Sequence, residues 1–320
     1  MPSPSSRKSR LSVEIVIPVY NEAGVVEQTH ASLRAAVDGL AHDFSFLYVD
    51  DGSSDGTAGS LAALAGGDHR VRYIELSRNF GHQAALTAGM DAARGDVVIT
   101  MDADGQHPPG LIGEMLSLVQ QGYDVVQTQR IEEAQPGSFK KWTSSGFYGL
   151  LNLISGTHVL PGAADFRALS RRAVDALKAM PEYHRFLRGM VAWMGFPSVI
   201  LPYHEPKRIA GKSKYSLGKM LRLASDAIFS FSLMPLYIGL SAGLGFIILA
   251  VAQMIYVLVI WLSGDTTRIV PGWSSLMAVL LIASGIIMIL LGFIGVYLGY
   301  IFQEVKRRPV YIVRGGGPDG

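Results

Sequence analysis

The sequence predicts an α/β protein with a mostly parallel sheet, followed by two membrane-spanning helices. Apolar runs rich in β-branched residues alternate with amphipathic stretches over the first 130 residues, and this alternation is typical of a parallel sheet covered by helices on both faces. The chain has 28 basic and 26 acidic residues, yet only two of them, Asp265 and Arg268, lie between Ala227 and Gln303. A single water-soluble globule is therefore excluded, and the charge density elsewhere is that of a folded soluble domain.

The first twelve residues are rich in Ser, Pro and Arg and contain no apolar stretch. We expect residues 1–12 to form a disordered basic arm and not a signal peptide. The chain has no cysteine, which excludes disulfides, thiol catalysis and Cys-ligated metals, so that a metal would need oxygen or imidazole ligands. The net charge of +2 gives no reason to expect a nucleic-acid partner.

A soluble α/β domain is expected over residues 13–214. Its strands are predicted over residues 13–19, 44–49, 71–76, 97–101 and 125–129, and its helices over 25–40, 57–65, 83–93 and 111–121. In sheets of this kind ligands bind beyond the carboxyl ends of the strands. No G-x-G-x-x-G motif follows the first strand and no G-x-x-x-x-G-K-[ST] motif is present, so dinucleotide-dependent dehydrogenases and P-loop ATPases are disfavoured.

Acidic residues follow two of the predicted strands. Asp102 and Asp104 are two residues apart, so strand alternation would aim both carboxylates to one side. With the amide oxygen of Gln106 they offer the oxygen ligands that Mg²⁺ or Mn²⁺ prefers, although a helix N-cap explains the same tripeptide. The adjacent Asp50 and Asp51 could accept hydrogen bonds from a nucleobase and a ribose.

The C-terminal part is expected to anchor the chain in a membrane. Residues 233–303 contain two uncharged stretches, 233–262 and 273–302, each longer than the roughly 20 residues that cross a bilayer. Basic residues flank the pair on both sides, so the positive-inside rule places the soluble domain, both termini and the tail 304–320 on the cytoplasmic side of the inner membrane. Residues 215–232 are predicted to form an amphipathic helix at the membrane surface or, alternatively, a helix packed on the soluble domain. The pair Gly295 and Gly299 suggests close helix approach and a homo-oligomer.

Several motifs in a fixed order resemble those of family 2 glycosyltransferases with the Rossmann-like GT-A fold. They are Ile17-Pro18-Val19-Tyr20-Asn21-Glu22, Asp50-Asp51-Gly52-Ser53-Ser54-Asp55-Gly56-Thr57, Arg78-Asn79-Phe80-Gly81 and Asp102-Ala103-Asp104-Gly105-Gln106-His107-Pro108-Pro109. The later motifs Asp165-Phe166-Arg167, Arg185-Phe186-Leu187-Arg188-Gly189 and Gly211-Lys212-Ser213-Lys214 narrow the resemblance to polyprenyl-phosphate glycosyltransferases, the group of dolichyl-phosphate-mannose synthase and bactoprenol glucosyltransferase. The resemblance covers about residues 12–310.

This resemblance implies metal-dependent, inverting transfer of a sugar from a nucleoside diphosphate to a polyprenyl phosphate such as undecaprenyl phosphate, for cell-envelope glycans. UDP-glucose is the first expected donor, and UDP-GlcNAc, a UDP-aminoarabinose derivative and GDP-mannose stay open. The residues implied to bind the nucleotide sugar are Pro18, Tyr20, Glu22, Asp50, Asp51, Asp102, Ala103, Asp104 and Asp165. The metal ligands implied are Asp104 and Gln106, with Mg²⁺ or Mn²⁺ as the ion. The catalytic residues implied are Asp102, Asp104, Arg130, Arg208 and Lys214, and those for the acceptor phosphate are Arg130, Lys141, Arg208, Lys212, Ser213 and Lys214.

The acceptor's chemistry limits what the site must supply. A phosphate monoester is already anionic at neutral pH, since its second pKa is about 6, so it needs no general base. It needs positive charge to approach an anionic donor, and six basic residues without an acidic one lie between Pro206 and Ser225. Attraction to anionic lipid explains that cluster equally well.

Other roles remain open. Asp165 either contacts the sugar or pairs with an arginine, and Glu182, Arg185 and Arg188 either line the acceptor site or form ion pairs of the scaffold. His107 could be a third contact of the metal, but a supporting or structural role is expected. A processive polysaccharide synthase is disfavoured because no Gln-x-x-Arg-Trp motif is present. The alternative of another class is an inactive, membrane-anchored protein that binds a nucleotide sugar.

Overall fold

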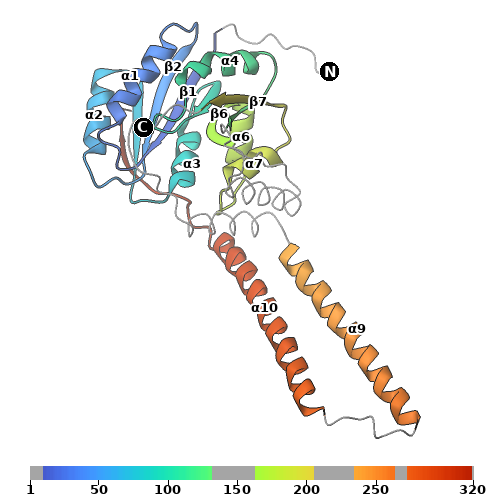
Figure 1. Ribbon diagram of the computed structural model, residues 1–320. Helices are drawn as coiled ribbons and strands as arrows, with labels where there is room; N and C mark the ends of the chain where they lie inside the picture. The colour runs from blue at the N-terminus through green and yellow to red at the C-terminus, as the bar shows by residue number, and fades with distance from the viewer. Residues whose placement is uncertain (1–9, 132–162, 205–233, 264–271, 319–320) are drawn as a thin grey trace. The chain divides into compact units, whose positions relative to one another are not determined.

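The computed structural model describes residues 10–131, 163–204, 234–263 and 272–318 (Figure 1). The chain divides into two compact units. The first comprises residues 1–153, 157–223 and 308–320, and the second comprises 154–156 and 224–307. The predictions for the basic arm up to residue 9 and for the amphipathic helix 215–232 lie outside the described residues.

The first unit contains an eight-stranded sheet in the order β7-β5-β6-β4-β1-β2-β3-β8. The strands are β1 (Ser12–Val19), β2 (Asp43–Asp50), β3 (Val71–Leu76), β4 (Val97–Thr100), β5 (Val125–Ile131), β6 (Ala163–Ser170), β7 (Ser198–His204) and β8 (Val313–Gly317). The helices are α1 (Val26–Val37), α2 (Thr57–Gly67), α3 (His82–Ala92), the short 3₁₀ helix η1 (Pro109–Leu111), α4 (Ile112–Gln120), α6 (Arg171–Ala179) and α7 (Leu187–Trp193). The mostly parallel α/β sheet is confirmed, because only β6 and β8 run antiparallel to their neighbours.

The five strands predicted from the sequence are all present, with ends within two residues of those expected. Strands β6, β7 and β8 were not predicted. β6 lies between β4 and β5, antiparallel to both, and its register pairs Thr100 with Arg167. Because the two strands are antiparallel, extending this register by two residues beyond Thr100 pairs Asp102 with Asp165. The start of β6 therefore lies beside the end of β4.

Two helix layers cover the sheet. Ile15 and Ile17 of β1 belong to a buried apolar cluster that includes Val26 and Leu33 of α1, because alternate residues of a strand share one face. Val16 faces the other way, toward α3. A Cβ atom built on Gly89 of α3 would collide with Cγ1 of Val16, so glycine lets this helix approach the sheet closely.

The chain's last strand, β8, follows the apolar C-terminal helix and joins the edge of the sheet beside β3. The backbone N–H of Ser77 donates to the carbonyl of Ile312 at 2.8 Å, and Tyr311 donates its hydroxyl to Asp91 at 3.0 Å. Arg314 pairs with Glu75 at 2.6 Å. The predicted tail 304–320 therefore contains a strand of the catalytic sheet.

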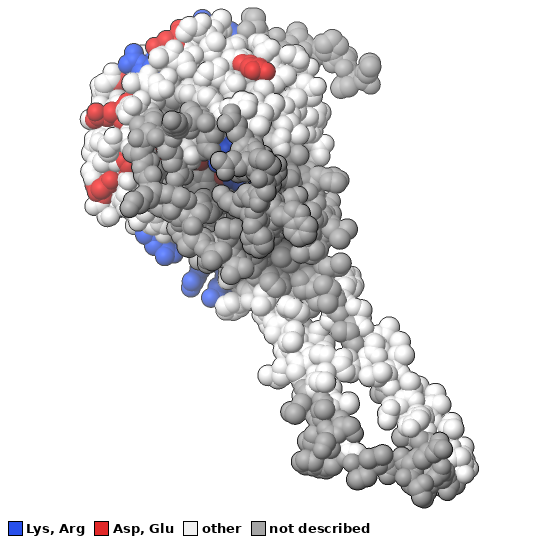
Figure 2. All heavy atoms as spheres, viewed as in Figure 1, with Lys and Arg blue, Asp and Glu red and all other residues white. Residues whose placement is uncertain are grey.

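The second unit consists in its described residues of two long helices, α9 (Met234–Leu262) and α10 (Trp273–Lys306). Their described surface carries almost no charge (Figure 2). Within the described residues, one segment, 282–306, is long and apolar enough to cross a membrane, so the second of the two expected spans stays a prediction. Gly239 of α9 contacts Leu290 of α10, whereas a Cβ atom added at Gly295 or Gly299 would meet no atom of the described chain within 4 Å.

Candidate active site

The polar motifs of the sequence gather at the carboxyl edge of the sheet. The ends of β1, β2 and β4 meet there because these strands are parallel and adjacent. The start of the antiparallel strand β6 and the first residue of α3 lie at the same edge, where their side chains contact those that follow β4. This edge is therefore the candidate active site.

Hydrogen bonds join the loop after β1 to the loop after β2. Asn21, in the left-handed conformation with φ of 53°, donates its backbone N–H to Ser53 Oγ at 2.9 Å and accepts from the backbone N–H of Ser54 at 2.9 Å. Asp55 accepts from the backbone N–H of Thr57, the first residue of α2, at 2.9 Å, and so provides a partner for an N–H group that has none within the helix. These hydrogen bonds fix the backbone of the loop that carries Tyr20 and Glu22, which are predicted to bind the nucleotide sugar.

Asp50 and Asp51 are both buried. Asp50 Oδ1 accepts from the backbone N–H of Ser53 at 2.9 Å, while its buried Oδ2 has no hydrogen-bond partner among the described residues. Asp51 accepts from the backbone N–H groups of Phe80 and Gly81 at 2.7 and 2.9 Å. Burial raises the pKa of Asp51, and these two N–H donors oppose the rise. Asp51 thus orders the loop that precedes α3, and the binding of a nucleotide by either residue stays a prediction.

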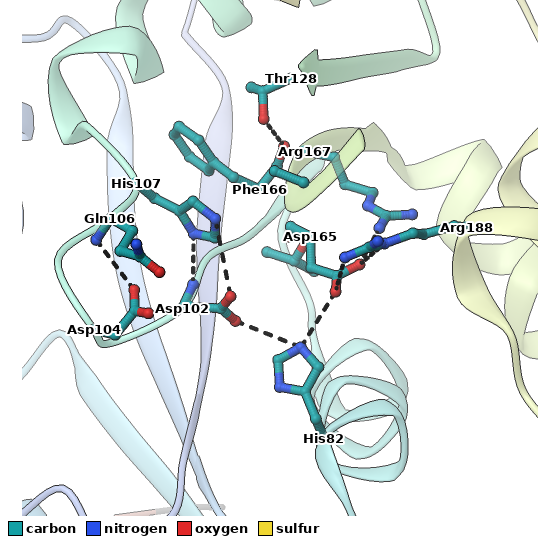
Figure 3. A network of polar contacts seen from close by, with 12 residues as sticks. His82, Asp102, Asp104, Gln106, His107, Thr128, Asp165, Phe166, Arg167 and Arg188 are labelled. Atoms are coloured by element: carbon teal, nitrogen blue, oxygen red, sulfur yellow. Dashed lines mark hydrogen bonds and ion pairs between the residues drawn. The ribbon is translucent and has the colours of Figure 1, made fainter. Parts of the chain in front are cut away.

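Asp104 and Gln106 lie in the loop after β4, where Asp104 Oδ1 accepts from the backbone N–H of Gln106 at 3.1 Å (Figure 3). Both residues are partly exposed and both carry side-chain oxygens. The described residues contain no group of three or more acidic or histidine side chains placed to hold a metal. Two protein oxygens suit Mg²⁺ or Mn²⁺ all the same, because such ions usually complete their shell with water and substrate phosphates.

Asp102 lies between two histidines (Figure 3). Its Oδ1 is 3.5 Å from Nε2 of His82, and its Oδ2 is 3.9 Å from Nε2 of His107. The backbone N–H of Asp102 donates to Nδ1 of His107 at 3.0 Å. The buried His107 ring also stacks on Phe166, with centroids 5.2 Å apart, so His107 has the structural role expected from the sequence.

Asp165 is buried at the centre of a cluster of cations. Arg167 donates to its Oδ1 at 2.5 Å, Arg188 donates to both of its oxygens at 3.1 and 2.9 Å, and His82 Nε2 lies 3.4 Å from Oδ2. Asp165 therefore pairs with two arginines, and Arg188 forms one of these ion pairs. A contact of Asp165 with the donor sugar and a role of Arg188 at the acceptor site stay predictions. Arg185 instead donates to backbone carbonyls, those of Met180 and Glu182.

These contacts shift two pKa values in opposite directions. Burial alone would raise the pKa of Asp165, but Arg188, His82 and Arg167 together hold it well below its usual range. Burial likewise opposes protonation of His82, yet Asp102 and Asp165 raise its pKa to about 9. At neutral pH the cluster therefore holds an ionised Asp165 beside a protonated His82.

The remaining predicted site residues are placed as follows. Pro18 is buried in β1, Tyr20 is 40% exposed just beyond it, and Ala103 is buried with its carbonyl accepting from Thr29 at 2.8 Å. Arg130 lies near the carboxyl end of β5, separated from β4 by β6. Lys141, Arg208, Lys212, Ser213 and Lys214 lie outside the described residues.

Sequence reasoning missed His82. It stands directly after the Arg78-Asn79-Phe80-Gly81 motif and begins a helix that packs on the sheet. A histidine at a helix start beside a motif loop was the available signal. Its partners come from β6 and from the loop after β4, so only the order of strands in the sheet reveals its position.

The sequence of this chain is similar to those of known proteins. The model of the family "Glycosyl transferase family 2" matches residues 14–177. The uncharacterized glycosyltransferase YkcC of Bacillus subtilis is 40% identical over 95% of this chain and 94% of its own length. The prophage bactoprenol glucosyl transferase homolog of Escherichia coli is 34% identical over 95% of this chain and 99% of its own length.

Solved structures are more distant. Glucosyl-3-phosphoglycerate synthase from Mycobacterium tuberculosis, in complex with Mn²⁺, UDP and glucosyl-3-phosphoglycerate, is 18% identical with a TM-score of 0.47, over 68% of this chain and 78% of that one. The sequence relationship is therefore the stronger finding, since the family model covers half of the chain and relatives match nearly all of it. This chain is a glycosyltransferase and belongs to glycosyl transferase family 2.

Proposed function

We propose that this protein transfers a sugar from a nucleoside diphosphate to the phosphate of a polyprenyl carrier, with inversion at the anomeric carbon. UDP-glucose is the proposed donor and undecaprenyl phosphate the proposed acceptor. The observation that carries the proposal is the similarity, over 95% of the chain, to relatives named bactoprenol glucosyl transferase. The carboxylate loop at the end of β4 supports it with a site of suitable chemistry.

In this proposal the donor lies over the carboxyl ends of β1, β2 and β4. Tyr20 is exposed enough to contact a base or ribose, and the buried oxygen of Asp50 without a hydrogen-bond partner among the described residues could accept from a nucleobase N–H. Asp104 and Gln106 would hold a divalent ion, which when bound stabilises the negative charge of the departing diphosphate. Mg²⁺ and Mn²⁺ both suit this pair of oxygen ligands.

The acceptor phosphate attacks without a general base. Asp165 is the most deeply buried carboxylate of the cluster, and it accepts from two guanidinium groups. A carboxylate with a pKa held so low is a weak base, which agrees with an acceptor that is already ionised. We assign the binding of its phosphate to Arg130 and to the predicted basic residues Lys141, Arg208, Lys212, Ser213 and Lys214.

The acceptor's isoprenoid tail requires a membrane. One described segment is long and apolar enough to span it, and we propose a second span in α9, with the catalytic unit on the cytoplasmic side of the plasma membrane. A homo-oligomer is part of the same proposal. Placement at the membrane would bring the catalytic site within reach of the lipid phosphate.

The test is transfer of labelled sugar by the full-length protein in lipid nanodiscs with undecaprenyl phosphate and Mg²⁺ or Mn²⁺. UDP-glucose is compared with UDP-GlcNAc, a UDP-aminoarabinose derivative and GDP-mannose, and label is counted in the organic phase. We expect label from UDP-glucose, and a loss of about 100-fold or more in Asp104→Ala, by analogy with the loss of a group that stabilises transition-state charge. The control is Asp175→Asn, since Asp175 is an exposed residue of α6. Nucleotide binding without transfer from any donor would support the inactive binding protein instead.

A further inference from the structure

His82 contacts two carboxylates from separate segments. Its Nε2 lies 3.5 Å from Asp102 Oδ1, in the loop after β4, and 3.4 Å from Asp165 Oδ2, in β6. Its side chain is 42% exposed, whereas that of Asp165 is only 6% exposed. His82 therefore stands at the border between the buried arginine cluster and the open edge of the sheet.

The identity of its neighbours fixes the proton on Nε2. Both are carboxylate oxygens, which in the ionised state only accept hydrogen bonds, so Nε2 must carry a hydrogen. Asp102 Oδ1 is buried and has no hydrogen-bond partner among the described residues. His82 is thus a cation whose charge offsets that oxygen at close range, and the guanidinium of Arg167 also interacts with Asp102.

The other side of Asp102 is also defined. Nδ1 of His107 accepts from the backbone N–H of Asp102, so the neutral ring carries its hydrogen on Nε2, which faces Asp102 Oδ2 at 3.9 Å. His107 is buried and stacked on Phe166, which fixes that ring. Of the two imidazoles, only His82 is exposed enough for its removal to leave the packing of the sheet intact.

We propose that His82 is a positioning residue: by bridging Asp102 and Asp165 it holds the Asp102 carboxylate in the orientation that donor binding and sugar transfer require. This inference rests on the proposed function. Without His82, the carboxylates of Asp102 and Asp165 would lie close to each other in a partly buried site with no imidazolium between them. Neighbouring like charges repel each other. The side chain of Asp102 would then turn away from Asp165 and out of its place beside the donor.

The pH dependence follows from all of the charged groups around the ring. Asp102 and Asp165 favour the imidazolium, Arg188 disfavours it, and the imidazolium in turn lowers the pKa of Asp51. Because the pKa of His82 is raised to about 9, above its ordinary value of about 6.5, the bridge is fully present below pH 6.5. It is lost as the pH rises through about 9.

The kinetic test compares His82→Ala, His82→Gln and His69→Gln in the full-length protein. Gln keeps a side-chain N–H donor but has no titratable charge, and His69 is an exposed residue of the turn before β3. We expect His82→Ala to lower kcat by about 10- to 100-fold, the range found when a group that orients a functional ligand is removed, with KM for the lipid phosphate unchanged. His82→Gln should recover only part of kcat at pH 7, because it keeps an N–H donor without the charge. It should lack the fall in activity that the wild type shows near pH 9, where His82 also loses its charge.

A second experiment detects the contact between His82 and Asp102 without requiring sugar transfer. With ¹⁵N-labelled histidine, the His82 signal is assigned by its loss in His82→Gln and followed between pH 5 and 10. We expect it to titrate well above pH 6.5 in the wild type and at lower pH in Asp102→Asn. If the wild type transfers no sugar from any donor, the proposed function fails while this experiment still reports on the bridge. The inference is overturned if Asp102→Asn leaves the titration unchanged, or if His82→Ala matches His69→Gln in kcat.

Discussion

Asp165 organises the centre of the site through one carboxylate. It accepts from Arg167 and Arg188 and lies beside His82, so three cationic side chains from β6, α7 and α3 converge on it. Removing one member of a buried ion pair lowers the free energy of unfolding by more than the intact pair contributes to it, because the partner's charge is left buried without an opposite charge. Arg167 is only 2% exposed, so its charge would be left buried and without compensation if Asp165 lost its own charge.

Asp165→Asn is expected to lower the free energy of unfolding by about 3–5 kcal/mol at pH 7. The pKa of Asp165 is lower in the folded chain than in the unfolded one, so its stabilising contribution is complete above the unfolded value of about 4. It is lost as the pH falls through the folded value. The difference between wild type and Asp165→Asn should therefore shrink below about pH 4, as measured by urea unfolding of the full-length protein in detergent.

Asp175→Asn serves as the matched control for this prediction. Asp175 is 60% exposed and forms an i,i+4 pair with Arg171, and exposed pairs contribute at most about 1 kcal/mol. A difference between wild type and Asp165→Asn that stays constant from pH 7 to pH 3 would show that the carboxylate's charge is not the cause.

At the scale of the elements, two antiparallel strands change what a simple β/α alternation would build. β6 enters between β4 and β5 and carries Asp165 to the end of β4. β8 adds a strand beyond β3, and its Arg314 pairs with Glu75 at the end of β3. Tyr311, just before β8, contacts Asp91 in α3. The C-terminal segment thus holds the two elements that flank the Arg78–Gly81 loop.

Gly316→Ala is expected to detach β8 from β3. A Cβ atom at position 316 would lie 2.6 Å from the carbonyl oxygen of Tyr73, whereas one at Gly315 would meet nothing within 4 Å. Hydrogen exchange of the Ser77 amide, which donates to Ile312, should accelerate by about tenfold or more in Gly316→Ala, since local opening governs such exchange. Gly315→Ala should exchange like the wild type, and equal acceleration in both variants would argue against a packing cause.

At the scale of the whole molecule, the apolar helices lie between two parts of one catalytic sheet along the chain. Residues 234–306 separate the bulk of the first unit from β8. A truncation before α9 therefore removes β8 as well, and its effects would mix loss of the membrane part with loss of a strand. A variant in which a flexible Gly/Ser linker replaces 234–306 keeps the strand.

We expect the linker variant to bind the nucleoside diphosphate of the donor nearly as well as the wild type and to lose most transfer to undecaprenyl phosphate. The physical reason is effective concentration, because a chain held at the bilayer meets a lipid-borne acceptor far more often than a free one does. Calorimetry measures nucleotide binding, and the organic-phase assay measures transfer. Equal loss of both would mean that residues 234–306 are needed for folding of the catalytic unit.

The sequence by itself determined the local features of this protein. The β-branched runs predicted five strands to within two residues, because periodicity and propensity act over neighbouring residues. The charge-poor C-terminal stretch indicated membrane helices, and the motif order indicated the family that the comparisons then showed.

Only the tertiary structure decided which distant residues meet. The insertion of β6, the return of β8 and the meeting of His82 with Asp102 and Asp165 each join segments far apart in the chain. Such contacts depend on which strands lie side by side in the sheet, and the local pattern of a strand does not encode its neighbours. A one-residue shift of β6 against β4 would have turned Asp165 to the other face of the sheet, and the sequence pattern would have looked the same.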